Sequence, residues 1–288
     1  MNNLAAVKGK RQSIRTGTDS LSDRSISDTA YVSLKWVAII TMVVHHVGYL
    51  LFANRIIGTN EYAACCTIGR MAFPLFCFLL VECYFHTKDR AKHLLKIALL
   101  AIISEVPWDY FYYGKVLNWN IQNVCVTLAL GFLMLCSMDM PVGKIIKSIF
   151  PKANENGKFV RFFTGVIRFD FCGVFAFMAF VLRTDYSYYG IFLIAFFRLA
   201  HIRKHHLTWI ICGLISFVLA KYPFDATMLF SLAALAFIVP AINSKSSKKG
   251  TCAERFDFLK HKVFRLIAIY SYPAHLVLLC AINLIIYR

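Results

Sequence analysis

The sequence contains few acidic residues and little polar sequence outside its first thirty or so positions. Its 15 Asp and Glu residues stand against 32 Lys and Arg, and 59% of the 288 residues are hydrophobic. Soluble domains contain about 45–50% apolar residues, so the composition excludes an ordinary soluble protein. The apolar residues form long continuous runs rather than short alternating strands, and such runs cross a bilayer as helices. We therefore predict an all-α, polytopic membrane protein.

The sequence motifs of common soluble enzymes are absent as well. There is no P-loop, no GxGxxG fingerprint, no HExxH, no GxSxG and no CxxC pair among the ten cysteines. We expect no metal site, and we interpret the cysteines as small apolar residues. A net charge of +17 would indicate nucleic acid as the partner of a soluble protein. Membrane topology explains it better, so no nucleic-acid partner is expected.

Nine apolar segments are long enough, or nearly so, to cross a membrane. With the N-terminus placed in the cytoplasm, 25 of the 32 Lys and Arg residues fall in inner segments and six in outer ones, as the positive-inside rule requires. We therefore predict a bundle of about nine transmembrane helices with a cytoplasmic N-terminus and an outer C-terminus. The segments span about 34–53, 71–86, 94–112, 123–138, 160–182, 189–200, 207–221, 226–242 and 263–287.

Two domains are expected from the same pattern. Residues 1–33 are polar and basic, with no short apolar core that would indicate a cleaved signal peptide, and we predict a disordered cytoplasmic tail there. Residues 34–288 are expected to form a single transmembrane helical domain in which the segments 139–160 and 243–262 are linkers.

Histidines in the middle of predicted spans are the strongest candidates for chemistry. His45 and His46 lie about 17 Å from the inner end of the first span at 1.5 Å per residue, and His275 and Glu105 lie at a similar depth. Ionisable groups at that depth are costly and are functional by default. We predict a catalytic site in which an imidazole is the general base and a carboxylate orients it. The alternative is that each imidazole only donates to a backbone carbonyl.

Adjacent helical residues point about 100° apart, so we expect at most one of His45 and His46 to face the site. The prolines Pro107 and Pro273 lie in the same layer and free backbone carbonyls there. Either they mark a cavity or they are simple packing kinks.

The inner end of the second span is a candidate donor site. Glu82 and His86 stand at i and i+4 and share a face, and a basic stretch follows them. A cationic rim of this kind could bind the phosphates of a nucleotide-containing donor, although ordinary positive-inside charge explains it equally well. The candidate cofactor-binding residues are His86, Lys88, Arg90, Lys92, Arg203 and Lys204.

Further polar residues are expected near the substrate or in structural roles. Asp185 and its neighbour Tyr186 lie in an outer turn, where Asp185 could pair with Arg70 or Arg183 or contact an acceptor. An oxyanion would need hydrogen-bond donors, and Asn123, Thr127 and Tyr272 could supply them. Asp109 is a second carboxylate near Glu105.

These residues lie in stretches that resemble the TraX family of conjugal-transfer membrane proteins. The resemblance covers about residues 32–287. In the first span the family pattern reads Asp-His, whereas this chain has His45-His46, so His46 takes the histidine position. The matching stretches are Leu34-Lys35-Trp36, His46-Val47-Gly48, Gly69-Arg70-Met71-Ala72-Phe73-Pro74-Leu75-Phe76, His86-Thr87-Lys88-Asp89-Arg90, Ser104-Glu105-Val106-Pro107-Trp108-Asp109, Gln122-Asn123-Val124, Thr127-Leu128, Thr184-Asp185-Tyr186, Tyr189-Gly190 and Tyr272-Pro273-Ala274-His275-Leu276.

The resemblance implies a multi-pass protein of the bacterial plasma membrane that transfers acetyl from acetyl-CoA to an acceptor. The acceptor would be a peptide, a glycan or a small molecule carrying an amine or hydroxyl, and lipid would surround the helices. Two other functions stay open. Midplane histidines and broken helices also occur in proton-coupled transporters, and the chain could be a non-catalytic assembly factor of a conjugation or secretion machine.

Overall fold

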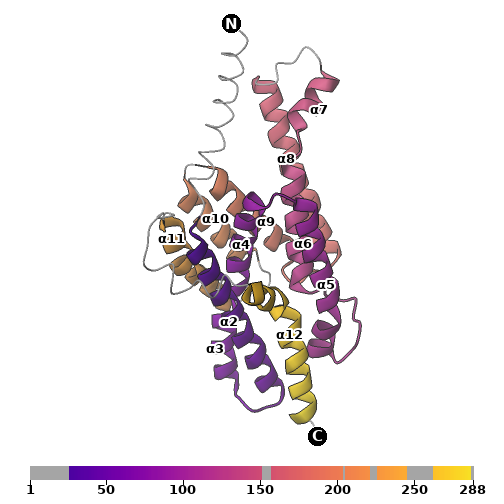
Figure 1. The fold of residues 1–288 in the computed structure, drawn as a ribbon, viewed down its shortest axis with the longest axis vertical. Helices are drawn as coiled ribbons and strands as arrows, with labels where there is room; N and C mark the ends of the chain where they lie inside the picture. The colour runs from indigo at the N-terminus through magenta and orange to yellow at the C-terminus, as the bar shows by residue number, and fades with distance from the viewer. Residues whose placement is uncertain (1–25, 151–156, 204, 221–225, 245–261, 287–288) are drawn as a thin grey trace.

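The computed structural model describes residues 26–150, 157–203, 205–220, 226–244 and 262–286. Across these ranges the chain is helical and contains no β-strand, apart from one isolated bridge between Gln122 and Thr184. Figure 1 shows the helices gathered into one elongated bundle. In chain order they are α2 (Asp28–Ala53), α3 (Thr59–Gly69), α4 (Ala72–His86), α5 (Arg90–Tyr113), α6 (Val124–Met138), α7 (Val142–Ile149), α8 (Lys158–Val181), α9 (Ser187–Ile202), α10 (His206–Leu219), η1 (Ala226–Ala234), α11 (Leu235–Asn243) and α12 (Lys262–Ile286).

Each of the nine apolar segments predicted from the sequence is mainly helical over its described residues, and two further helices, α3 and α7, were not predicted. Helix α2 begins at Asp28, where the Ser27 side chain accepts a hydrogen bond from the backbone N–H of Ala30 at 3.2 Å and so caps the helix. Residues 28–33, expected in the tail, therefore form its first turns. The remainder of the expected tail, residues 1–25, lies outside the described residues.

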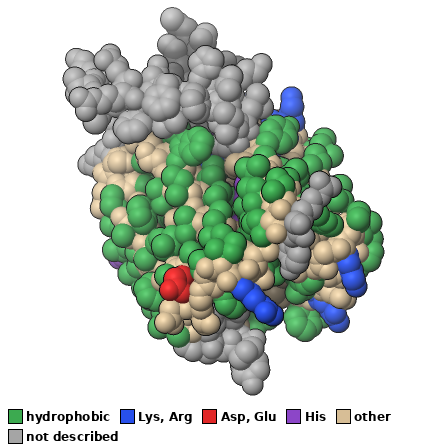
Figure 2. Space-filling view, turned by 90° about the horizontal axis from the view of Figure 1, so that it is seen from below, with side chains coloured by type: hydrophobic (Ala, Val, Ile, Leu, Met, Phe, Trp, Pro, Cys, Tyr) green, Lys and Arg blue, Asp and Glu red, His purple; other side chains and the backbone are tan. Residues whose placement is uncertain are grey.

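Several helices are long and apolar enough to cross a membrane. They are Asp28–Ala53, the joined pair Thr59–His86, Lys158–Val181 and Ala226–Asn243, with a fifth if α6 and α7, which meet at 48°, form one broken span. Hydrophobic side chains cover much of the face shown in Figure 2. The chain is therefore a helical membrane protein.

Helix α4 lies among α2, α6, α9 and η1 and contributes most to the core. Its side chains from Phe73 to Tyr84 are almost all buried, in a cluster that α6, α9 and α10 complete. A second, smaller cluster joins α2, α5 and α12 through Met42, Trp108, Tyr272 and Leu276. This second cluster borders the cavity described below.

The helices α2 and α3 pack closely because glycines face larger side chains between them. A Cβ atom added at Gly48 would collide with the Cβ of Cys65, and one added at Gly69 would collide with the Cβ of His45. Small residues allow helix backbones to approach in this way inside a membrane. The close approach fixes His45 against α3.

Candidate functional site

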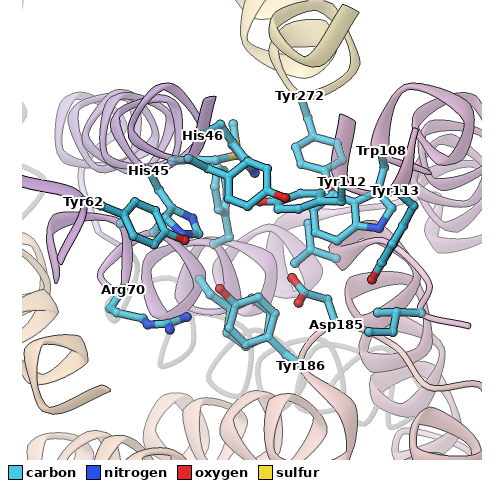
Figure 3. A pocket seen from close by; sticks show the side chains of 18 residues that line it. His45, His46, Tyr62, Arg70, Trp108, Tyr112, Tyr113, Asp185, Tyr186 and Tyr272 are labelled. Carbon is cyan, nitrogen blue, oxygen red and sulfur yellow. The ribbon is translucent and has the colours of Figure 1, made fainter. Parts of the chain in front are cut away.

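A cavity of about 280 Å³ lies at the end of the bundle where α2 meets α3, α5 and α12. Figure 3 shows its aromatic and charged side chains directed toward a shared space. The lining residues are Met42, His45, His46, Tyr49, Tyr62, Gly69, Arg70, Ala72, Phe73, Phe76, Trp108, Tyr112, Tyr113, Ile121, Val124, Asp185, Tyr186 and Tyr272.

His46 and His275 form a hydrogen-bonded pair beside this cavity. The Nε2 atom of His275 lies 2.9 Å from Nδ1 of His46, and Nδ1 of His275 lies 2.7 Å from the carbonyl oxygen of Ser271. A carbonyl can only accept, so His275 carries its hydrogen on Nδ1. In the neutral pair, Nε2 of His275 then accepts from Nδ1 of His46. This leaves the lone pair of His46 on its Nε2 atom, where it can take a proton.

Aromatic rings surround the imidazole of His46, which is only 5% exposed. The ring centroids of Phe111, Tyr112, Trp108 and Tyr272 lie 5.9 to 6.4 Å from it, in edge-on arrangements. A positive charge is costly in such surroundings unless a partner compensates it. The site therefore favours the neutral imidazole, which is the basic form.

His45 also lines the cavity, contrary to the expectation that at most one of the two histidines faces the site. Its ring centroid lies 5.5 Å from that of His46. Both can face the cavity because it extends around α2 from α3 to α5 and α12. Two side chains about 100° apart on α2 therefore meet the same space.

Arg70, Asp185 and Tyr186 line the side of the cavity away from α12 (Figure 3). The Nε–H of Arg70 donates to Oγ1 of Thr227 at 3.1 Å. The backbone N–H of Asp185 donates to the carbonyl of Gln122 at 2.9 Å, which fixes the turn before α9. The ring of Tyr186 stacks on that of Phe73 at 3.6 Å. These three residues, expected near the substrate or in structural roles, therefore share one wall of the cavity.

The carboxylates predicted to orient the histidine base lie elsewhere. Oε2 of Glu105 accepts hydrogen bonds from the side chain of Asn123 and from its backbone N–H, the latter at 3.3 Å. Oδ2 of Asp109 accepts from the backbone N–H of Asn118 at 2.6 Å. Neither residue is among the lining residues, and the group that orients His46 is His275.

Asn123 and Thr127, two of the expected oxyanion donors, are not among the residues that line the cavity. The Oδ1 atom of Asn123 accepts from the backbone N–H of Cys125 at 2.8 Å and caps α6, while its amide donates to the carbonyl of Ala101 at 2.8 Å. Thr127 is fully buried on α6. Tyr272, the third expected donor, does line the cavity.

The predicted donor-binding residues lie at the opposite end of α4. The helix rises about 20 Å between Phe73, which lines the cavity, and His86. Glu82 and His86 do not join their side chains there. Instead, Nδ1 of His86 donates to the backbone carbonyl of Glu82 at 2.7 Å, and the carboxylate of Glu82 contacts Nδ1 of His201 at 2.9 Å.

Asp139 pairs with two arginines at this end of the bundle. Its carboxylate contacts Arg198 at 2.5 Å and Arg90 at 3.3 Å, and accepts from the Tyr84 hydroxyl at 2.8 Å. Burial raises the pKa of this carboxyl, but the hydrogen bonds from Arg198 and Tyr84 hold it below its ordinary value. Lys88 and Lys92 are exposed and Arg203 ends α9. The predicted contact by Lys204 lies outside the described residues.

Sequence patterns did not identify the aromatic wall of the cavity, which Trp108 and Tyr112 form. They also did not identify His201, the buried partner of Glu82. Trp108 and Tyr112 stand four residues apart on α5, with ring centroids 4.3 Å apart, and this i, i+4 spacing was a usable signal. His201 gave no comparable signal, because its pairing with Glu82 joins α4 to α9 across the core.

Comparison with known proteins identifies the family. A stretch of 119 residues is 31% identical to a protein of Dichelobacter nodosus described as a probable fimbrial assembly protein FimC, serogroup H1. That match covers 39% of this chain and 47% of the relative, so the chain spans about half the length of the relative it matches. No solved structure matches. The family model described as TraX protein matches residues 31–283, and the chain belongs to the TraX family.

Proposed function

We propose that the chain is a membrane-embedded acyltransferase whose reaction takes place in the cavity beside His46. The observation that carries this proposal is the His46–His275 pair, because the carbonyl of Ser271 fixes both tautomers and leaves a basic nitrogen on a residue that lines a cavity. A buried neutral imidazole is the usual general base for transfer to an amine or hydroxyl.

The proposed step uses an acyl thioester as donor. His46 Nε2 takes the proton from the acceptor while the acceptor nitrogen or oxygen forms a bond to the acyl carbon. The carbon–sulfur bond then breaks, and the leaving thiolate takes the proton back from His46. His275 holds the imidazole of His46 and shares the charge that it gains, as a third group does in other catalytic histidine systems.

Acetyl-CoA is the proposed donor, as family membership suggests. The exposed cations Lys88 and Lys92 at the turn between α4 and α5 suit its phosphates, whereas Arg90 is paired with Asp139. These lysines and the cavity lie at opposite ends of α4, about 20 Å apart. The proposal therefore requires a long donor whose thioester end reaches into the bundle.

We further propose nine crossings of the bacterial plasma membrane with the N-terminus in the cytoplasm. The alternation of basic segments supports this arrangement. It places the α4–α5 turn on the cytoplasmic side and the cavity toward the outer side, with lipid against the exposed apolar faces.

The relative named for fimbrial assembly suggests that the acceptor belongs to a pilus or conjugation apparatus. Within the proposal the acceptor is a peptide, glycan or small molecule that offers an amine or hydroxyl. A non-catalytic assembly role is the competing account. It predicts that the histidines can be replaced by apolar residues without effect.

The proposal is tested by incubating the purified protein with acetyl-CoA and a panel of amines and hydroxyl compounds. We expect acceptor-dependent release of CoA by the wild type, a loss of about 10²–10⁴-fold in His46→Ala, and a smaller loss in His275→Ala. His206→Ala is the matched control, because His206 is exposed at the start of α10. Undiminished transfer in both His46→Ala and His275→Ala would overturn the mechanism.

A further inference from the structure

Two buried hydrogen-bond donors line the cavity without a partner. The indole Nε1 of Trp108 and the hydroxyl of Tyr272 each lack a hydrogen bond within the described part of the chain. Both side chains are 6% exposed and both line the cavity. Buried polar groups are nearly always paired, and an unpaired one costs about 1–3 kcal/mol. Two such groups beside one cavity suggest that a ligand bound there supplies the missing hydrogen-bond acceptors.

The chemistry of the two groups narrows what they bind. An indole N–H can donate but cannot accept, so Trp108 needs an acceptor atom. A tyrosine hydroxyl donates in addition to accepting. Two donors that line one cavity suit an oxygen that carries, or develops, negative charge.

Both rings also pack around the imidazole of the proposed base. The ring centroids of Trp108 and Tyr272 each lie 6.4 Å from that of His46. Trp108 comes from α5 and Tyr272 from α12, so the two rings reach the cavity from different helices (Figure 3). The ring of Tyr112 packs on the indole at 4.3 Å and fixes its direction before any ligand enters.

We propose that Trp108 Nε1–H and Tyr272 O–H form the oxyanion hole of the acyl-transfer site. This inference rests on the proposed function. As the acceptor bonds to the acyl carbon, the electron pair of the carbonyl π bond moves to its oxygen, and the two donors bind that oxygen. When the pair returns, the carbon–sulfur bond breaks and the thiolate takes the proton from His46. The same two donors bind the carbonyl of the intact thioester more weakly.

The test uses Trp108→Phe and Tyr272→Phe, which remove the donors and keep an aromatic ring. We expect kcat to fall about 10²–10³-fold in each variant, with KM for acetyl-CoA changed by less than about threefold and the pH dependence set by His46 unaltered. The controls are Trp209→Phe and Tyr188→Phe. Trp209 lies on α10, and the Tyr188 hydroxyl donates to the carbonyl of Ala220; neither lines the cavity.

Thermal unfolding supplies a second readout. Removing an unpaired buried donor should leave Tm unchanged or raise it, since a desolvated group is lost without a bond being broken. Variants that keep the wild-type kcat, or that lose activity only in proportion to lost folded protein, would overturn the oxyanion hole alone. Absence of transfer by the wild type with every acceptor would instead overturn the proposed function and this inference with it. If His46→Ala loses transfer while both Phe variants keep the full kcat, the oxyanion hole is overturned and the proposed function stands.

Discussion

At the scale of single residues, the position of one hydrogen decides which nitrogen of the histidine pair is the base. The carbonyl of Ser271 can only accept, so the order of donors runs from His46 Nδ1 to His275 Nε2 and from His275 Nδ1 to Ser271. Depth along the predicted spans was enough to bring His46 and His275 to one layer. The same depth was expected for Glu105, whose carboxylate contacts Asn123 instead of the cavity, because depth gives the height of a residue in the membrane but not the direction in which its side chain points.

Glu105 gives a residue-scale prediction. Its carboxylate accepts from Asn123, which caps α6, so Glu105→Gln should weaken a charge-assisted bond and cost about 1 kcal/mol of unfolding free energy. The transfer rate should stay within a few-fold of wild type. Thermal unfolding and CoA release measured on the same preparation check both parts. A loss of 100-fold or more in the transfer rate, at unchanged stability, would show that Glu105 takes part in catalysis and would contradict this prediction.

At the scale of helices, close packing of α2 on α3 positions His45 and the segment of α2 that carries both histidines. Gly69 leaves no room for a Cβ beside His45, so the separation of these helices depends on a residue outside the histidine motif. Sequence patterns predicted α2 from its long apolar run. They missed α3 because it is short and polar at its start, and α7 because it has only eight residues, two of them lysines.

Gly69→Ala should therefore push α2 from α3 and cost about 1–3 kcal/mol through overpacking, with a parallel fall in transfer rate. Gly173→Ala is the matched control, since a Cβ there meets nothing within 4 Å on the exposed side of α8. Alanine is the better helix former by about 1 kcal/mol, so this control should be as stable as wild type or more so. Equal Tm values for the two variants would contradict the packing argument.

The contact between Glu82 on α4 and His201 on α9 gives a second prediction at this scale. His201→Phe keeps the stacking on Phe85, whose ring lies 4.0 Å away, but leaves the buried carboxylate of Glu82 without its donor, at a cost of about 3–5 kcal/mol. Glu82→Leu combined with His201→Phe should be less destabilised than His201→Phe alone, because no charge is then left buried. A double-mutant cycle of denaturation midpoints measures this, and a double variant less stable than both single ones would contradict it.

At the scale of the whole molecule, the bundle separates two kinds of polar residues. The paired imidazoles and the aromatic wall lie at one end of α4, and the exposed lysines of the α4–α5 turn lie at the other. Short motifs indicated the family, and apolar run lengths predicted the helices, because burial and lipid impose such runs on the sequence. They could not predict which end of the bundle each polar group occupies relative to a cavity, since that depends on how helices far apart in the sequence turn their faces toward one another.

The nine-crossing arrangement predicts the side of each loop. A reporter that is active only outside the cytoplasm should be active when fused at the C-terminus and inactive when fused after residue 150, because an odd number of crossings separates the two ends. Expression of each fusion, measured by immunoblot, is the control. Activity at position 150 or its absence at the C-terminus would require a different number of crossings.

The most direct measurement is a structure of the full chain with a non-transferable acetyl-CoA analogue, in which a methylene group replaces the thioester sulfur. The account predicts that the analogue's carbonyl carbon lies in the cavity, about 3–4 Å from the imidazole of His46 or from an acceptor held by it, with the phosphates toward Lys88 and Lys92. A carbonyl bound at the α4–α5 turn, with the space beside His46 unoccupied by the analogue, would contradict it.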